Sequence, residues 1–216
     1  FFFDSESWTR GGFRPVMLKE QKRQDENSTY YKMLSRLRFG DTSELHVLAP
    51  RFNAEIEGHD DPVRIYCLDR QVDEYNAKRY ALLKEQERVF MGIVHGDDKH
   101  KDYFDRNCPA PRILKLKIGA KVMLLKNIDT EHGLVNGSVG VVKSFSPTGV
   151  EVDFGQYGHA IIESDKWEIK EQVADVTGEM KYKVAASFSQ IPLKLCFSIS
   201  THKIQGQTLD AAIIDL

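Results

Sequence analysis

The residues best suited to chemistry lie in one short polar segment near the carboxyl end of the sequence. From Ser200 to Asp210 it reads Ser-Thr-His-Lys-Ile-Gln-Gly-Gln-Thr-Leu-Asp. The ammonium of Lys203 is a compact charge suited to phosphate, and the amide of Gln205 can both donate and accept a hydrogen bond. Gly206 lets the backbone approach a phosphate closely because it carries no Cβ. Taken singly these are ordinary surface and turn residues, and the functional interpretation is that their side chains contact phosphate groups.

Apolar runs on both sides place this segment at the end of a strand. Residues 193–200 form the preceding run, and residues 211–216 have the pattern of a buried strand. Earlier in the chain, residues 63–68 form a short run rich in β-formers, and a helical pattern follows over residues 72–86. A strand, a sharp turn and a helix form the unit of α/β domains, in which ligands bind at the carboxyl ends of strands. We therefore expect an α/β domain that presents residues 200–210 at such an edge.

Two further helices and a loop are expected around this unit. Apolar residues recur at helical spacing between residues 30 and 37, and Gly40 is a good stop. Thr42 could cap a second short helix that ends before Pro50. Residues 92–107 are polar and aperiodic, which predicts a loop.

The hydrophobic period changes to two between residues 113 and 192. Short strands recur there at intervals of roughly ten residues, and Asn136-Gly137 is a strong turn signal between two of them. Such spacing is typical of a small barrel or sandwich. We therefore expect an all-β insertion over residues 113–192, inside an α/β domain formed by residues 1–112 and 193–216. The expected strands cover residues 122–125, 137–145, 150–154 and 160–162.

The composition excludes several kinds of protein without indicating a partner. The chain has 216 residues, a net charge of −2, 41% apolar residues and 29% charged residues. This suits a globular protein with a core of its own. The three cysteines lie far apart, and no cysteine or histidine spacing fits a zinc site. No apolar run approaches the roughly 18 residues of a membrane span, so we expect neither a metal nor a membrane partner.

One stretch of the sequence is locally basic and has two interpretations. No acidic residue occurs between Arg112 and Lys126. Such a run is usually a solvated strand face, which is the more common meaning of a cluster of charges. The alternative is a surface that follows the phosphates of a nucleic acid. The cations of this run are Arg112, Lys115, Lys117, Lys121 and Lys126.

The polar segment also resembles a known motif. Residues 193–210 are similar to motif V of the superfamily-one helicases, closest to the petite-integration-frequency (PIF) family and its RecD-like relatives. Residues 116–127 and 133–142 are similar to the hairpin that opens the family's inserted barrel. Residues 2–8 and 22–24 resemble its motif IV region, so the resemblance spans nearly the whole chain. The positions that fit the motif V core are Ser200, His202, Lys203, Gln205, Gly206 and Thr208.

The resemblance implies a RecA-like second motor domain, 2A, interrupted at the boundaries given above by a small all-β barrel of the Src-homology type, 2B. In such helicases ATP with Mg²⁺ lies between two RecA-like domains and is bound mainly by the first. Arg23 is the implied motif IV arginine, a catalytic residue whose rigid, permanently charged fork contacts the γ-phosphate. Gln205 and Gly206 are implied to lie near the same nucleotide.

The resemblance also implies contacts with DNA. The polar residues after the motif V strand would face DNA phosphates. The family often has a threonine at the end of the strand that precedes the helix of Asn76. Here that position holds Cys67, and a thiol is a poor donor to phosphate. The implied DNA-binding residues are Ser200, His202, Lys203, Asn76, Lys121 and Lys126.

The implied activity is that of an ATP-dependent 5′–3′ DNA helicase, in a family that serves DNA repair, recombination and telomere maintenance. Its implied partners are single-stranded DNA, forked or structured DNA, and the first motor domain of the same protein. The whole protein is expected to be a monomer. The sequence contains no G-x-x-x-x-G-K-[ST] phosphate loop, and motif VI would follow Leu216. Both ends look like the interior of a longer protein. We therefore expect this chain alone not to hydrolyse ATP.

Two other classes of function compete with the helicase. A nucleic-acid-binding module without a motor would bind DNA in a salt-dependent way and ignore ATP. A hydrolase would use Ser198 or Ser200 with His202. The sequence provides neither nucleophile-elbow glycines nor an evident acid to orient the histidine, which disfavours the hydrolase.

Overall fold

The structure is a computed structural model, and its contacts divide the chain into two units. Unit 1 is Phe1–Glu55 and unit 2 is Ile56–Leu216, and each is described by itself. Arg23, the implied catalytic arginine, lies outside the described residues, so its place stays a prediction. The structure describes residues 2–14, 16–17, 25, 27–56, 58, 61–174, 179–206, 209 and 211–215.

Unit 1 consists of short helices. The expected helix is confirmed as α2 (Thr29–Arg38), which begins after the N-cap Ser28 and ends before Gly40, whose φ is +82°. The expected second helix is a 3-10 helix, η2 (Leu45–Arg51), and it includes Pro50, which we expected to lie beyond it. Proline fits there because its fixed φ of about −65° is also the φ of a 3-10 helix. The remaining helices of this unit are η1 (Phe2–Asp4) and α1 (Glu6–Arg10).

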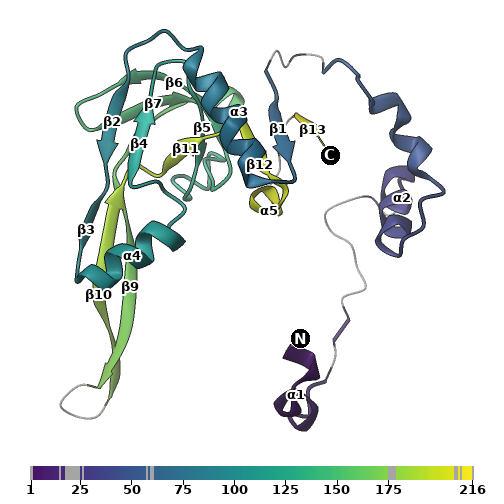
Figure 1. The fold of residues 1–216 in the computed structure, drawn as a ribbon, viewed down its shortest axis with the longest axis horizontal. Coiled ribbons are helices and arrows are strands. Elements are labelled where there is room, and N and C mark those ends of the chain that lie inside the picture. The colour runs from purple at the N-terminus through teal and green to yellow at the C-terminus, as the bar shows by residue number, and fades with distance from the viewer. Residues whose placement is uncertain are drawn as a thin grey trace. The chain divides into compact units, whose positions relative to one another are not determined.

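Unit 2 contains a small parallel sheet that positions the polar segment. Strand β1 (Val63–Tyr66) is central, and β12 (Ser198–Ser200) and β13 (Ala212–Asp215) pair with it on either side, both parallel. Helix α3 (Asp69–Ala81) follows β1 and packs beside β12 (Figure 1). The expected strand–turn–helix unit is therefore confirmed, with a helix that begins three residues earlier than the apolar pattern indicated.

A five-stranded antiparallel sheet forms the second layer of unit 2, and its order is β11-β5-β6-β7-β8. The core against which this sheet packs is fully buried, since Val122, Leu124, Val142 and Leu193 are all 0% exposed. The four expected strands are found, because alternate residues of each pack into this core, as the period of two requires. The strands are β5 (Lys121–Leu124), β6 (Val139–Phe145), β7 (Gly149–Asp153), β8 (His159–Glu163) and β11 (Leu193–Leu195), with η3 (Gly155–Tyr157) after β7.

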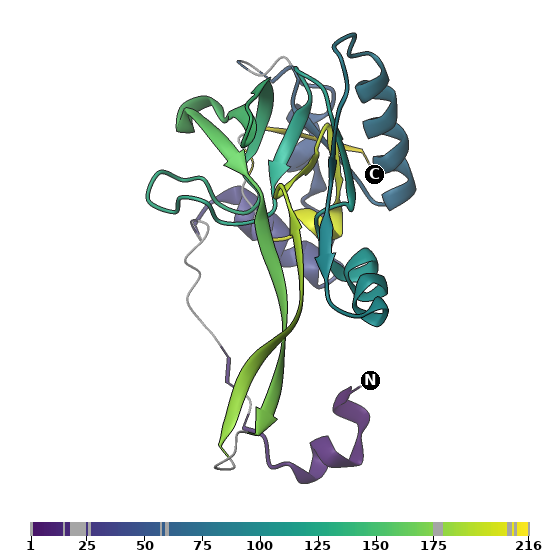
Figure 2. The same ribbon diagram turned by 90° about the vertical axis from the view of Figure 1, so that its left-hand side faces the viewer.

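A long hairpin extends from this β-rich part. Its strands β9 (Asp165–Ala174) and β10 (Met180–Gln190) pair antiparallel and project away from the other strands in both views (Figures 1 and 2). Strand β3 (Ile93–His95) pairs with β10 near its carboxyl end. Beside it, β2 (Arg88–Met91) pairs with β4 (Ile113–Leu116).

The loop expected over residues 92–107 is wrong, because this stretch contains β3 and the helix α4 (Asp98–Asn107). The helix is polar except for a few residues, so its sequence shows little helical periodicity. Phe104 anchors it: the side chain is 5% exposed, and its ring centroid lies 5.7 Å from that of Phe188 in β10. Tertiary contact, which a local pattern does not contain, therefore stabilises this helix.

The apolar run 193–200 forms two strands on two different sheets. Strand β11 pairs with β5 in the five-stranded sheet, and β12 pairs with β1 in the parallel sheet. Strand pairing thus joins residues 88–95 and 193–195 to the β-rich part, outside the expected limits of 113 and 192. The boundaries of the inserted domain stay a prediction. In the described part of the chain, no helix has the length and apolar character of a membrane span.

Candidate functional site

The polar segment lies at the carboxyl edge of the parallel sheet, as expected. Tyr66 at the end of β1 is level with Ser200 at the end of β12. Helix α3 starts just after β1, and the short helix α5 (Thr201–Ile204) starts just after β12. The two turns meet in an ion pair between Lys203 Nζ and Asp69 Oδ1, 3.1 Å apart. Cys67 is exposed on the turn after β1.

The electrostatics of this edge centre on Asp69. The Ser200 hydroxyl and then the Lys203 ammonium hold the pKa of Asp69 below its usual value. Ser200 is only 2% exposed, and its Oγ has no hydrogen-bond partner of normal geometry among the described residues. The edge therefore combines an exposed ion pair with a buried hydroxyl that acts on the same carboxylate.

His202, Gln205 and Gly206 follow on the same turn, and all three are exposed. Gly206 has φ +84°, and a Cβ added there would meet nothing within 4 Å. Glycine is therefore required by the left-handed backbone and not by lack of space. The structure thus brings together five of the predicted site residues on one surface turn. Thr208 of the motif lies outside the described residues.

Asn76 joins α3 to β12. Its Oδ1 accepts a hydrogen bond from the Ser198 N–H at 2.9 Å, and its Nδ2 donates to the Ser198 carbonyl at 3.2 Å. The Ser198 hydroxyl donates to the Val72 carbonyl at 3.0 Å. This geometry makes Asn76 a positioning residue for the strand that carries the site. Its contact with DNA stays a prediction, and its second amide hydrogen is available for it.

The hydrolase alternative finds no support in this geometry. Ser198 is only 2% exposed, and its hydroxyl donates a hydrogen bond to the Val72 carbonyl. Within the described residues, no hydrogen bond joins His202 to either Ser198 or Ser200, so no nucleophile and base are paired.

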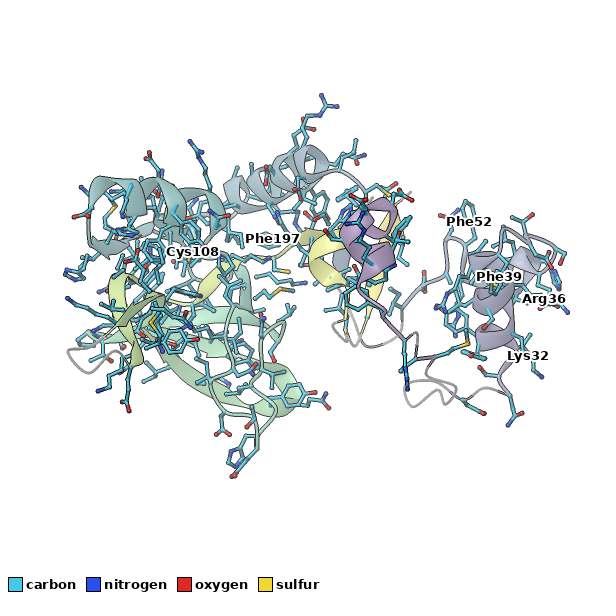
Figure 3. All side chains as sticks on the ribbon, turned by 90° about the horizontal axis from the view of Figure 1, so that it is seen from below. Lys32, Arg36, Phe39, Phe52, Cys108 and Phe197 are labelled. Atoms are coloured by element: carbon cyan, nitrogen blue, oxygen red, sulfur yellow. The ribbon has the colours of Figure 1, made fainter. Side chains whose placement is uncertain are left out.

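Lys121 lies in an ionic cluster between the β-rich part and the parallel sheet. Its Nζ is 3.0 Å from Asp61 Oδ2 and also contacts the Asp61 carbonyl. Arg79 Nη1 of α3 lies 2.7 Å from Asp61 Oδ1. Burial opposes ionisation of Asp61, but the hydrogen bonds from Arg79 and Lys121 outweigh it and lower the pKa of Asp61. Arg79 also lies 5.2 Å from the ring centroid of Phe197, which Figure 3 labels.

Lys126 is held in the same way at the base of the hairpin. Its Nζ lies 2.9 Å from Asp165 Oδ2, contacts the Lys166 carbonyl and lies 4.6 Å from the ring centroid of Trp167. Contact of Lys121 and Lys126 with DNA stays a prediction, but it would have to compete with these partners.

The other cations of the basic run also have partners within the chain. Arg112 lies 3.0 Å from Asp105, and Lys115 lies 3.6 Å from Glu87. Lys117 donates to the Leu83 carbonyl at 2.8 Å. Each cation of the run therefore has an acid or a carbonyl from elsewhere in the chain, which favours the structural interpretation of the run over a phosphate-tracking surface.

Three residues of functional interest gave no signal in the sequence. Asp61 and Arg79 were not singled out because their ion pairs connect positions far apart in the chain. Lys194 was also missed, since it reads as one charge within the apolar run 193–200. Its environment becomes visible only when the strands are placed in space.

Comparisons with known proteins match this chain along its whole length. Residues 100–145 match the family model described as the 2B domain of DNA helicase Pif1. The ATP-dependent DNA helicase PIF1 of Mus musculus is 34% identical over 229 residues, which cover 100% of this chain and 32% of that protein. The chain thus spans about a third of the length of this curated relative.

Two solved structures give the same result for the fold. Pif1 from Bacteroides sp in complex with ADP-AlF4 has a TM-score of 0.80 and 26% identity, over 99% of this chain and 48% of that chain. Pif1 helicase from Bacteroides in complex with ADP-AlF3 and ssDNA has a TM-score of 0.61 and 27% identity, with the same coverage. These matches confirm the expected fold class, a RecA-like α/β domain with a small β domain.

Proposed function

Because this chain belongs to the Pif1 helicase family, we propose that it forms the second motor domain and the 2B domain of an ATP-dependent 5′–3′ DNA helicase. The observation that carries this proposal is the turn 200–206 at the carboxyl edge of the parallel sheet, where His202, Gln205 and Gly206 are exposed beside the Lys203–Asp69 ion pair. The names of the relatives support ATP and DNA as ligands, since one solved relative was crystallised with ADP-AlF3 and ssDNA.

The nucleotide side of the proposal uses three residues. ATP with Mg²⁺ is held mainly by the first motor domain. Gln205 and Gly206 line the opposite wall of the nucleotide cleft, where the exposed amide and the Cβ-free backbone can approach phosphate. Arg23 supplies the charge that stabilises the transferring phosphoryl group, with a contribution of about 10³-fold or more to the rate.

The DNA side of the proposal uses the first turn after β12. Lys203 is more than half exposed, so a DNA phosphate can take over from Asp69 as the partner of its ammonium. His202 is exposed beside it, and Ser200 offers a hydroxyl. Closure of the two motor domains on ATP would change these contacts, so that the strand advances with each cycle. The tethered Lys121 and Lys126 do not support this step.

The test measures ATP hydrolysis and strand separation by the full-length protein that contains this chain. Arg23→Ala and Gln205→Ala are compared with Gln172→Ala, a control on strand β9 outside the proposed site. We expect the first two variants to lose DNA-stimulated ATP hydrolysis and the control to retain it. The circular dichroism of all three should match that of the wild type. Unchanged turnover in both site variants refutes the assignments. Salt-dependent DNA binding without any response to ATP would instead indicate the module without a motor.

A further inference from the structure

A hollow of about 870 Å³ lies in unit 2 between α3, α4 and the strands β4 and β11. One wall is apolar and includes Pro109, Pro111 and Leu114, next to Cys108, which Figure 3 labels. Its volume is in the range that suits small ligands or a short stretch of a polymer.

The lining of this hollow also includes side chains from the edge of the parallel sheet that carries the polar segment. Asn76, Lys194 and Lys203 all line it. Asn76 and Lys203 belong to the proposed site, so the hollow continues that site towards the β-rich part. The acids that also line the hollow are Asp73 and Asp105, and Asp105 is neutralised by Arg112 at 3.0 Å.

Lys194 differs from the other cations around this hollow. Lys203, Arg112 and Lys115 each have a carboxylate within 4.0 Å. Lys194 is half-buried on β11, and among the described residues its ammonium has neither an ion pair nor a hydrogen bond. Burial lowers the pKa of Lys194, and the nearby charge of Lys203 lowers it further.

The two lysines leave one positive charge unbalanced. Asp69 is the acid that acts on both, and it is already paired with Lys203. A partly desolvated cation beside a like charge is unfavourable unless an anion shares the site. A ligand that brings one negative charge between the ammonium groups would remove both penalties.

We propose that Lys194 and Lys203 together hold one phosphate of a DNA single strand that enters this hollow. The inference rests on the proposed function and adds a binding residue to it. A phosphodiester fits because it supplies the missing charge, while the apolar wall can take the face of a sugar or base. Asn76 has an amide hydrogen left to donate to the same phosphate.

The test is the salt dependence of binding to a fluorescein-labelled oligothymidine, measured by anisotropy with the full-length protein. The slope of the logarithm of the affinity against the logarithm of the salt concentration reports the number of phosphates neutralised, with about 0.7 per phosphate of a single strand. Because Lys203 still contacts the shared phosphate, we expect Lys194→Gln to reduce the slope by less than about 0.7, and the double variant with Lys203→Gln to reduce it by about 0.7. The matched control is Lys143→Gln on β6, which removes the same charge from a lysine that does not line the hollow.

A second measurement excludes loss of the fold as the cause. Lys194→Met keeps the length of the side chain and removes a half-buried charge, so we expect an unchanged or raised thermal midpoint without DNA together with the same loss of slope. Because the lysines share one phosphate, the double variant with Lys203→Gln should lose less affinity than the product of the two single losses.

The outcomes separate this inference from the proposed function. An unchanged slope in Lys194→Gln, with normal binding by the wild type, overturns the phosphate subsite and leaves the helicase assignment standing. Strictly multiplicative losses overturn the shared phosphate. Competition by millimolar inorganic phosphate with an unchanged slope would indicate a free-phosphate site and also overturns the inference. Absence of any DNA binding by the wild type refutes both.

Discussion

Replacing Asp61 by asparagine tests whether the ionic cluster stabilises unit 2. The carboxylate of Asp61 accepts from Arg79 at 2.7 Å and from Lys121 at 3.0 Å. The side chain of Lys121 is only 12% exposed, so it cannot regain full hydration when its partner loses its charge. Asparagine keeps the shape and one acceptor oxygen, which isolates the effect of the charge.

The expected loss follows from these contacts. A hydrogen bond to a charged group contributes about 1.5–3 kcal/mol net. The side chains of Asp61 and Arg79 are 39% and 30% exposed, so solvent screening reduces this. Since asparagine retains one acceptor, we expect Asp61→Asn to lower the free energy of unfolding by about 1–2 kcal/mol. The control is Asp215→Asn, whose ion pair with Arg64 spans 3.9 Å at 54% exposure, and its loss should stay below about 0.5 kcal/mol.

The assay is urea unfolding of a Trp8→Phe background, in which Trp167 is the remaining fluorophore, repeated over a range of pH. The pKa of Asp61 is lowered in the folded state, so its stabilisation is complete above the unfolded pKa of about 4. It is lost as the pH falls through the lower folded value. The difference between wild type and Asp61→Asn should therefore be full at pH 7 and shrink in acid. A loss equal to that of Asp215→Asn, or one that grows in acid, refutes the reasoning.

Three further predictions follow from single residues. Asn76→Ala should cost about 1–3 kcal/mol, because the Ser198 backbone loses both its partners, as measured by urea unfolding. Gly206→Ala should lower the free energy of unfolding by about 1–2 kcal/mol, because alanine at φ +84° is strained although its Cβ meets no other atom. In the full-length protein it should also reduce the rate of ATP hydrolysis. Phe104→Ala should cost about 3–5 kcal/mol and release α4 from Phe188, seen as faster amide hydrogen exchange in residues 98–107. Slow exchange there would contradict the anchor role.

Local patterns in the sequence were sufficient for the elements with a regular hydrophobic period. The strand and helix around Val63 and Val72, and the short strands from Lys121 to Glu163, follow from spacing alone. The site turn was also predictable, because its polar residues directly follow an apolar run. Its order of residues carried the family resemblance that the comparisons later supported.

What escaped prediction depends on contacts between distant positions. The helix α4 depends on Phe104 meeting Phe188, and the pairing of Lys121 and Lys126 depends on the distant acids Asp61 and Asp165. The break in the run 193–200 depends on which sheet each half joins. The lack of an ion pair at Lys194 among the described residues is a property of the three-dimensional structure. No local pattern contains that information.

The two residues between β11 and β12 join the five-stranded sheet to the turn 200–206 with little freedom between them. Cys196 is 0% exposed, and burial raises the pKa of its thiol to about 12, so it stays a neutral, packed group. Phe197 lies against Arg79. Three peptide units join Leu195 to Ser198, span at most about 11 Å and have little slack, because both neighbours are hydrogen-bonded strands. A displacement of the turn 200–206 would therefore be transmitted directly to the five-stranded sheet, which a long flexible linker would not do.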